Sequence, residues 1–131
     1  MDKKLKVSIL NCQGLNKLNK ILLIKDMLRV EKVDIGFLQE THIAHEENLC
    51  NLIKHLHDYN VFSELSEDKT RGVAIIIKKT LNLKVENFRA YNNRCISLDI
   101  KMDGRIFNLF NVYAPNLPEE QISFIEDLKS I

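Results

Sequence analysis

The sequence contains no tryptophan, only four glycines and two prolines, and three cysteines among 131 residues. It shows no internal repeat, linker or low-complexity segment. Cys12, Cys50 and Cys95 are an odd number, and their spacings match neither a disulfide framework nor a zinc motif. We therefore expect ordinary thiols in a reducing compartment, which excludes a fold that depends on disulfides.

Long hydrophobic runs are also missing. Runs such as residues 73–77 are far shorter than the roughly 20 apolar residues that a membrane span needs, so we expect no membrane partner. Neither a secretory signal nor a transit peptide is visible in the first residues. These absences predict an intracellular protein, in the nucleus or the cytoplasm.

The net charge is only +1, but the charged residues are distributed in blocks. Residues 1–32 and 69–111 are rich in lysine and arginine, whereas residues 33–68 and 112–131 are rich in acids. Two basic blocks around an acidic one are compatible with a polyanion held beside a cation-binding pocket. Such blocks are more often simply solvated faces, and the near-neutral total argues against strong nonspecific affinity for DNA.

The length and the 45% hydrophobic content fit one soluble domain over residues 1–131. Residues 4–10 predict a strand, residues 16–31 an amphipathic helix and residues 33–38 a second strand. These elements form a βαβ unit with parallel strands, which favours the α/β class. The apolar residues behind these assignments are Leu5, Val7 and Ile9, then Leu18, Ile21, Leu22, Met27 and Leu28, then Ile35, Phe37 and Leu38.

A second helix follows, and β structure dominates after it. Glu46 and Glu47 lie in the expected first turn of this helix, where the helix dipole favours acids. Asp103-Gly104 supplies a two-residue turn, which predicts an antiparallel hairpin of residues 96–102 and 106–112. The remaining expectations are Leu49, Leu52, Ile53 and Leu56 on the second helix, strands at 59–62, at 73–77 and around Leu81, Leu83 and Val85, and a last helix from Pro118 with Ile122, Ile125 and Leu128 on one stripe.

Polar clusters follow three of the predicted strands, at residues 11–14, 39–42 and 111–116. The most informative member is Glu40, an acid that comes directly after an apolar strand. Open α/β sheets place ligands and metals at the ends of their strands, so the three clusters can converge on one rim. A carboxylate with amide and phenol groups suits a magnesium ion and a phosphate, because magnesium commonly takes one or two protein carboxylates together with water and phosphate oxygens.

Each of these residues also has a structural interpretation. Alone, Glu40 is more often a strand-end acid than a ligand, and Tyr113 is an amphipathic residue at a rim. Asn11 and Asn116 can equally cap turns and helices. The four histidines and Cys50 lie close together in the sequence, but their offsets do not match paired zinc ligands.

Four short motifs occur along the chain: Asn-x-x-Gly-Leu at 11–15, Leu-Gln-Glu-Thr-His at 38–42, Arg-Gly-Val-Ala-Ile-Ile-Ile at 71–77 and Asn-Val-Tyr-Ala-Pro-Asn at 111–116. With these motifs, in this order and spacing, the sequence resembles the endonuclease/exonuclease/phosphatase superfamily. It looks most like exonuclease III and the apurinic/apyrimidinic endonucleases, and especially like the endonuclease domain of non-LTR retrotransposon polyproteins. The resemblance spans nearly the whole chain.

The resemblance implies the N-terminal part of a four-layer α/β sandwich of the deoxyribonuclease I-like type, with a mixed sheet flanked by helices. It also implies hydrolysis of DNA phosphodiesters with Mg²⁺ or Mn²⁺, in DNA repair or in retrotransposon target nicking. Carried over by position, Glu40 is the metal-ligating acid and Asn11 helps to order the metal site. Tyr113 is the catalytic residue that contacts the scissile phosphate, and Asn116 binds a DNA phosphate.

Two departures from the family pattern modify these expectations. Gln13 stands where many repair members have aspartate, which favours the retrotransposon branch. The family's later Gly-Asp-x-Asn and Ser-Asp-His motifs are absent, so the chain resembles a truncated N-terminal half that does not hydrolyse DNA at a useful rate alone. A missing second sheet would leave an apolar sheet face and a strand edge uncovered, which predicts marginal solubility or self-association.

Two other classes of function remain open. The same superfamily includes phosphatases of inositol lipids and other small substrates, although the motifs at 38–42 and 111–116 favour nucleases. Alternatively, the chain is a noncatalytic remnant or binding module that descends from a mobile element. Turnover of a soluble phosphoester without cutting of DNA would indicate the phosphatase.

Overall fold

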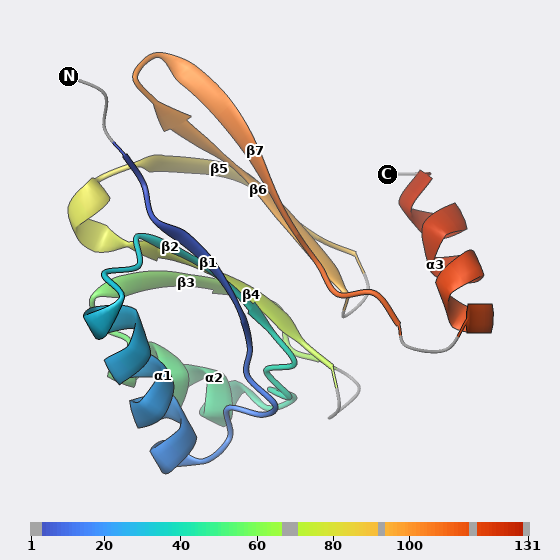
Figure 1. Ribbon diagram of the computed structural model, residues 1–131, viewed down its shortest axis with the longest axis horizontal. Coiled ribbons are helices and arrows are strands. Elements are labelled where there is room, and N and C mark those ends of the chain that lie inside the picture. Colours follow the sequence, from blue (N-terminus) through green and yellow to red (C-terminus); the bar gives the residue numbers. More distant parts are fainter. Residues whose placement is uncertain (1–3, 67–70, 92–93, 116–117, 130–131) are drawn as a thin grey trace.

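Two β-sheets packed face to face form the centre of the protein, with helices outside them (Figure 1). The computed structural model describes residues 4–66, 71–91, 94–115 and 118–129. The elements are, in chain order, β1 (Val7–Asn11), α1 (Leu18–Val30), β2 (Ile35–Gln39), α2 (Glu46–His55), β3 (Tyr59–Ser63), β4 (Val73–Lys78), the short 3₁₀ helix η1 (Lys79–Leu81), β5 (Lys84–Tyr91), β6 (Cys95–Met102), β7 (Arg105–Val112) and α3 (Pro118–Lys129).

The first sheet, sheet A, contains the predicted βαβ unit. Its strand order is β1-β2-β4-β3, and β1 is parallel to β2, with Val7 opposite Ile35 and Asn11 opposite Gln39. β4 is antiparallel to both β2 and β3. The carboxyl ends of β1 and β2 therefore lie at one rim, where the antiparallel β4 begins. The prediction of a mixed sheet is confirmed.

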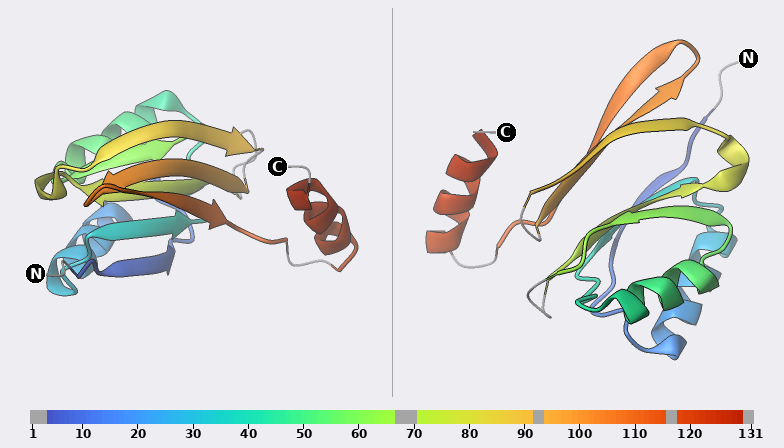
Figure 2. Two further views of the ribbon diagram at one scale, coloured as in Figure 1. Left: turned by 90° about the horizontal axis from the view of Figure 1, so that it is seen from above. Right: turned by 180° about the vertical axis from the view of Figure 1, so that it is seen from behind.

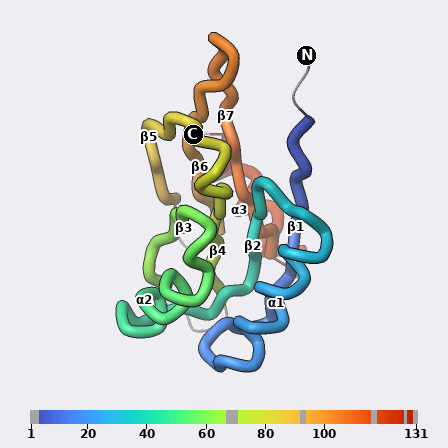
Figure 3. Tube along the Cα trace, turned by 90° about the vertical axis from the view of Figure 1, so that its left-hand side faces the viewer, coloured from blue at the N-terminus to red at the C-terminus, as the bar shows by residue number. Residues whose placement is uncertain are grey.

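Helices α1 and α2 cover the outer face of sheet A (Figure 3). Each presents apolar side chains at helical spacing: Ile21, Ile24 and Leu28 are buried in α1, and Leu52 is buried in α2. Leu56, directly after α2, is buried as well. These side chains and alternate residues of β2 and β4 form one core cluster, which is why both helices lie flat on the sheet.

The second sheet, sheet B, consists of three antiparallel strands in the order β5-β6-β7 (Figure 2). Ile96, Leu98 and Ile100 of β6 pack on the apolar face of β4. The predicted hairpin is confirmed, because β6 and β7 are joined by Asp103 and Gly104. Both turn residues have positive φ, 52° and 74°, as a tight two-residue hairpin turn requires.

The prediction that the second sheet is missing was wrong, because residues 84–112 themselves form sheet B. Sheet B covers the inner face of β2 and β4 but leaves β1 open. Val7 and Ile9 of β1 are 51% and 70% exposed, although their alternation predicts an apolar buried face. Within sheet A, the uncovered apolar side chains therefore lie on the edge strand β1.

Some local predictions also differ from the structure. The strand expected around residues 81–85 begins only at Lys84, because residues 79–81 form η1 and Asn82 has a φ of 51°. A left-handed backbone interrupts an extended chain. On α1, three residues of the predicted stripe are exposed: Leu18, Leu22 and Met27. The buried stripe of α1 is narrower than the sequence indicates, because a single sheet face covers it.

Helix α3 stands beyond the end of β7, away from the two sheets (Figure 1). Ile122 and Ile125 on its predicted apolar stripe are 68% and 51% exposed, whereas Phe124 is buried. Within the described residues, no surface packs against Ile122 and Ile125. Helical periodicity therefore predicted the wrong buried side chains for α3, where Phe124 is the buried one. Among the described helices, none is both long enough and apolar enough to cross a membrane.

Candidate functional site at the strand ends

The loops after β1 and β2 extend the sheet pairing as far as Glu40. The backbone N–H of Gly14 donates to the Glu40 carbonyl at 2.8 Å. On the other side, the His42 N–H donates to the Arg71 carbonyl, also at 2.8 Å. Glu40 directly follows the last residue of β2, so it lies at the rim between the loop after β1 and the start of β4.

The backbone of this rim is strained. Gln13, Glu40 and His42 are non-glycine residues with positive φ, at 50°, 53° and 59°. Each such conformation costs about 1–2 kcal/mol and persists only where the surroundings impose it. The flanking hydrogen bonds of Gly14 and Arg71 supply that constraint. Strain of this kind is common at active sites and ligand clamps.

An inter-sheet clamp, formed by Asn111 and Gln39, joins sheet B to sheet A at the same rim. The Asn111 Nδ2 donates to the Leu38 carbonyl at 3.0 Å and to the Ala74 carbonyl at 2.8 Å. Gln39 Nε2 donates to Asn111 Oδ1 at 3.3 Å and to the Val112 carbonyl at 2.9 Å. Asn111 is only 2% exposed, so these bonds are shielded from water. The clamp fixes the end of β7 against the ends of β2 and β4.

Tyr113 follows the clamp and reaches Glu40. Its hydroxyl lies close enough to the Glu40 carboxylate for the two side chains to interact. Burial raises the pKa of the Tyr113 phenol, the interaction with the Glu40 carboxylate and the charge of that carboxylate raise this pKa further, and the positive charge of Arg94 opposes the rise. The phenol therefore keeps its proton at neutral pH and can donate a hydrogen bond. Two candidate residues from distant parts of the sequence are thus in contact.

The other two candidate residues stand apart from this pair. Asn11 is exposed at the end of β1, and its Oδ1 accepts a hydrogen bond from the Gln13 N–H at 3.2 Å. Within the described residues Asn11 makes no hydrogen bond to Glu40 or Tyr113. Asn116 lies outside the described residues.

The described residues fit part of a site for a hard cation. Among them, no three or more His, Cys, Asp or Glu side chains are grouped so that they could hold a metal, and this includes the histidines considered for zinc. Glu40 offers one carboxylate, and the Asn11 amide and the Tyr113 hydroxyl are oxygen donors at the same rim. Mg²⁺ keeps several waters and commonly uses one or two carboxylates, so this sparse oxygen set suits it.

His42 supports the rim from one side. A Cβ added to Gly14 would lie 3.0 Å from His42 Nδ1, so the imidazole packs directly on that loop. His42 Nε2 is buried, and it has no hydrogen-bond partner in the part of the chain that the structure describes. A buried nitrogen without a hydrogen-bond partner lowers the free energy of unfolding by about 1–3 kcal/mol. The His42 ring therefore supports the loop at Gly14, whose N–H donates to the Glu40 carbonyl, although its own Nε2 is unsatisfied within the described residues.

Sequence reasoning missed how Asn111, Gln39 and Arg94 act. It identified Asn111 and Gln39 only as polar residues at strand ends. A usable signal was present, because Asn111 lies two residues after Leu109, on the same face of β7, and Leu109 packs against the core. A polar residue at such a position needs buried hydrogen bonds. Arg94 has no comparable signal, since it lies in a turn before β6.

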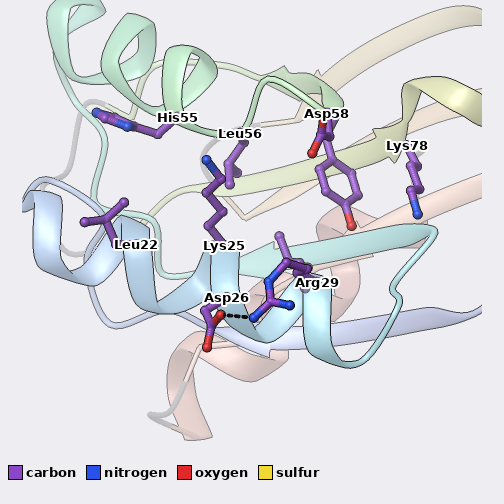
Figure 4. Close-up of a pocket in the computed structure, with 10 residues that line it drawn as sticks. Leu22, Lys25, Asp26, Arg29, His55, Leu56, Asp58 and Lys78 are labelled. Atoms are coloured by element: carbon purple, nitrogen blue, oxygen red, sulfur yellow. Dashed lines mark hydrogen bonds and ion pairs between the residues drawn. The ribbon is translucent and has the colours of Figure 1, made fainter.

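A cavity of about 250 Å³ lies between α1 and α2, at the far end of sheet A from Glu40 (Figure 4). Leu56 and Tyr59 form part of its wall. Arg29 and His55 at its rim lie in the last turns of α1 and α2, where the helix dipole favours positive charge. Arg29 is also paired with Asp26 at 2.7 Å. The ends of the helices thus account for these two basic residues, and the cavity shares no residue with the rim at Glu40.

Several known proteins are similar to this chain. The Xenopus laevis protein described as "Transposon TX1 uncharacterized 149 kDa protein" is 29% identical over 128 residues, which are 96% of this chain and 10% of that protein. The endonuclease domain of TRAS1, a telomere-specific non-LTR retrotransposon, superposes with a TM-score of 0.68 at 22% identity, over 96% of this chain and 52% of that domain. The AP endonuclease LMAP from Leishmania major superposes with a TM-score of 0.72 at 18% identity, over 96% of this chain and 47% of that chain.

These similarities show the fold and the family. The likeness to the solved structures confirms the expected N-terminal part of a deoxyribonuclease I-like α/β sandwich, and this chain spans about half the length of those structures. The model of the Endonuclease/Exonuclease/phosphatase family matches residues 9–130, nearly the whole chain. The matched region contains Glu40, the inter-sheet clamp and Tyr113. The chain therefore belongs to the endonuclease/exonuclease/phosphatase family.

Proposed function

We propose that this chain carries part of a metal-dependent nuclease site that hydrolyses DNA phosphodiesters with Mg²⁺ or Mn²⁺. The observation that carries the proposal is the contact between the Tyr113 hydroxyl and Glu40 at one rim. A carboxylate suits the cation, and a protonated phenol suits a phosphate oxygen. Family membership and the nuclease names of similar structures support this choice.

Each residue has a distinct task in this proposal. Glu40 would hold the cation as a carboxylate ligand, and Asn11 would help to order the site from the neighbouring strand. The cation, when bound, supplies positive charge beside the phosphate. Tyr113 would donate a hydrogen bond to a phosphate oxygen, because its raised pKa keeps the phenol protonated at neutral pH. Asn116 would bind a DNA phosphate.

DNA is the proposed substrate because basic side chains lie around the same rim. Lys17 directly precedes α1, and the charge of Lys20 acts on the thiol of Cys12 in the loop after β1. Arg71 lies before β4, where its carbonyl binds the His42 N–H. Cations at these positions can neutralise phosphates along a DNA backbone, which sets register and orientation rather than sequence specificity.

The site is sparse in these 131 residues. Glu40 is the carboxylate that contacts Tyr113, and within the described residues it belongs to no larger acid or histidine cluster. A group that could activate a water molecule is therefore not identified among them. We propose that this chain alone binds the cation but does not cut DNA at a useful rate.

Manganese binding tests the role of Glu40. Titration with Mn²⁺, followed by electron paramagnetic resonance, should show a site in the unmodified chain that Glu40→Gln weakens at least about tenfold, because a neutral amide replaces the charged ligand. Glu47→Gln is the matched control, since Glu47 is an exposed acid in the first turn of α2. Equal Mn²⁺ affinity in Glu40→Gln and in the unmodified chain would contradict the proposed metal site.

A nicking assay tests the proposed inactivity of the chain alone. With supercoiled or abasic DNA and Mg²⁺, we expect DNA binding without cutting above background. Robust cutting that Glu40→Gln abolishes would refute the inactivity but support the nuclease assignment. DNA binding that is independent of both Mg²⁺ and Glu40 would instead favour the noncatalytic binding module.

A further inference from the structure

Arg94, in the turn before β6, contacts Tyr113 through both its backbone and its side chain. The Tyr113 N–H donates to the Arg94 carbonyl at 2.7 Å. The Arg94 Nη1 donates to the Tyr113 carbonyl at 3.5 Å, and Cζ lies 5.8 Å from the centroid of the Tyr113 ring. The short backbone bond holds the backbone of Arg94 against that of Tyr113. The longer side-chain contacts place the guanidinium beside the phenol.

The burial of Arg94 shows that these contacts are part of a larger arrangement. Its side chain is only 12% exposed, which is unusual for an arginine without partners. The Nη2 lies 3.8 Å from Glu120 Oε2 in α3. Gln121, the next residue of α3, donates from Nε2 to the Pro115 carbonyl at 2.8 Å. The start of α3 is therefore linked to Tyr113 through Arg94 and through the chain at Pro115.

We propose that Arg94 is a positioning residue that holds the Tyr113 ring with its hydroxyl toward Glu40, and that Glu120 holds Arg94 in place. The inter-sheet clamp fixes the backbone before Tyr113, whereas Arg94 acts on the ring and the carbonyl. A guanidinium beside an aromatic ring is attracted to it, and more strongly when both are shielded from water. The inference rests on the proposed function of Tyr113, but its geometry can be tested without metal or DNA.

The test measures the distance between the Tyr113 ring and Glu40 by NMR in the full chain. The nuclear Overhauser effect between the Tyr113 ring protons and the Glu40 side chain should be present in the unmodified protein. It should be lost in Arg94→Met, which removes the planar cation and leaves the backbone bond. Arg94→Lys should weaken it less, because the charge remains but the planar face is gone.

Arg89→Met is the matched control, since Arg89 is an exposed arginine on β5 in the same sheet and should leave the effect unchanged. If Arg94→Met distorted the fold as a whole, the ring signals of Tyr59 and Tyr91 would shift as well. We expect these signals to stay in place. An unchanged Tyr113–Glu40 effect in folded Arg94→Met would overturn the proposal.

Two milder variants decide the matter if Arg94→Met does not fold. Arg94→Lys and Glu120→Gln both retain a cation and the backbone bond to Tyr113. Weakening of the Tyr113–Glu40 effect in both supports the proposal, and full retention in both overturns it. Absence of Mn²⁺ binding in the unmodified chain would contradict the proposed function alone, because the NMR test uses no metal.

Discussion

Asn111 is a polar side chain at an inward-facing position of an otherwise apolar strand face. Its amide donates to the carbonyls of Leu38 and Ala74 and accepts from Gln39, so one residue connects three strands across two sheets. The position of Tyr113, two residues later, depends on these bonds. Asn111 thus both stabilises the fold and sets the geometry of the site.

Replacing Asn111 should therefore affect stability and geometry at once. Asn111→Ala removes three hydrogen bonds of a buried side chain, two to carbonyls and one from Gln39, and we expect the free energy of unfolding to fall by about 2–4 kcal/mol. Urea unfolding measures this change. The matched control is Asn108→Ala on the same strand, because Asn108 is exposed and its side-chain amide donates to the carboxylate of Asp99 in an exposed hydrogen bond rather than to a buried carbonyl. An equal fall in the free energy of unfolding in the two variants would mean that the buried bonds of Asn111 stabilise the fold no more than the exposed bond of Asn108.

Cys12 predicts a dependence of stability on alkaline pH. Burial raises the pKa of its thiol from 9.0 to about 12. Between these values the unfolded chain loses a proton that the folded chain retains, so folding is disfavoured progressively as pH rises. We expect a contribution of about −1.4 kcal/mol per pH unit from pH 9 toward pH 12.

Urea unfolding at several pH values checks this dependence. Tyr59, Cys95 and Tyr113 have raised pKa values and act in the same direction, so the measurement compares variants. Cys12→Ala should flatten the decline of stability between pH 9 and pH 11, whereas Cys50→Ala, at an exposed position, should leave it intact. Identical pH profiles for the two variants would show that the Cys12 thiol is not shielded.

At the scale of the elements, two glycines with positive φ differ in their surroundings: Gly72 precedes β4 at the rim, and Gly104 lies in the turn between β6 and β7. Gly72 has a φ of +114°, and a Cβ there would lie 2.3 Å from Thr41 Oγ1, a buried side chain. Gly104 has a φ of +74°, but nothing lies within 4 Å of an added Cβ. Only at Gly72 is backbone strain combined with a steric clash.

Alanine at the two glycines should separate these constraints. We expect Gly104→Ala to cost about 1 kcal/mol, from the left-handed backbone alone. Gly72→Ala should cost several times as much, of the order of 3 kcal/mol, because Thr41 and the backbone at His42 must also move. Thermal unfolding compares the two variants, and a smaller loss for Gly72→Ala than for Gly104→Ala would contradict the close approach.

The elements differ in how far the sequence predicts them. The βαβ unit and the hairpin were predicted correctly, because helical spacing, alternation and the Asp103-Gly104 turn are local signals. The start of β5 was not, because Asn82 adopts a left-handed backbone that apolar alternation does not reveal. The apolar stripe of α3 failed for another reason, since burial depends on a partner surface and not on periodicity.

For the molecule as a whole, the open edge is the main departure from a closed sandwich. In the described part of the chain, β1 pairs only with β2 and β7 pairs only with β6, so each leaves one edge without a partner. Five large apolar side chains lie exposed on these two strands: Val7 and Ile9 on β1, and Ile106, Phe107 and Phe110 on β7. An exposed apolar edge strand is a template for pairing with another chain.

We propose that this edge causes self-association, and sedimentation velocity tests it. The sedimentation coefficient should rise with protein concentration, and Ile9→Lys combined with Phe110→Lys should suppress the rise because charge on an edge strand opposes pairing. Ile53→Lys is the control, since Ile53 is 43% exposed but lies on α2. A concentration-independent monomer in the unmodified chain would contradict the proposal.

By itself, the sequence determined the order of strands and helices, the position of Glu40 at the end of β2 and the motifs that place the chain in its family. These properties depend on residues that are near one another in the chain. Only the tertiary structure decided that Tyr113 meets Glu40, that Asn111 holds the two sheets together and that Arg94 lies beside the phenol. Such contacts depend on how two sheets pack and which edges stay open, and no local period encodes that packing.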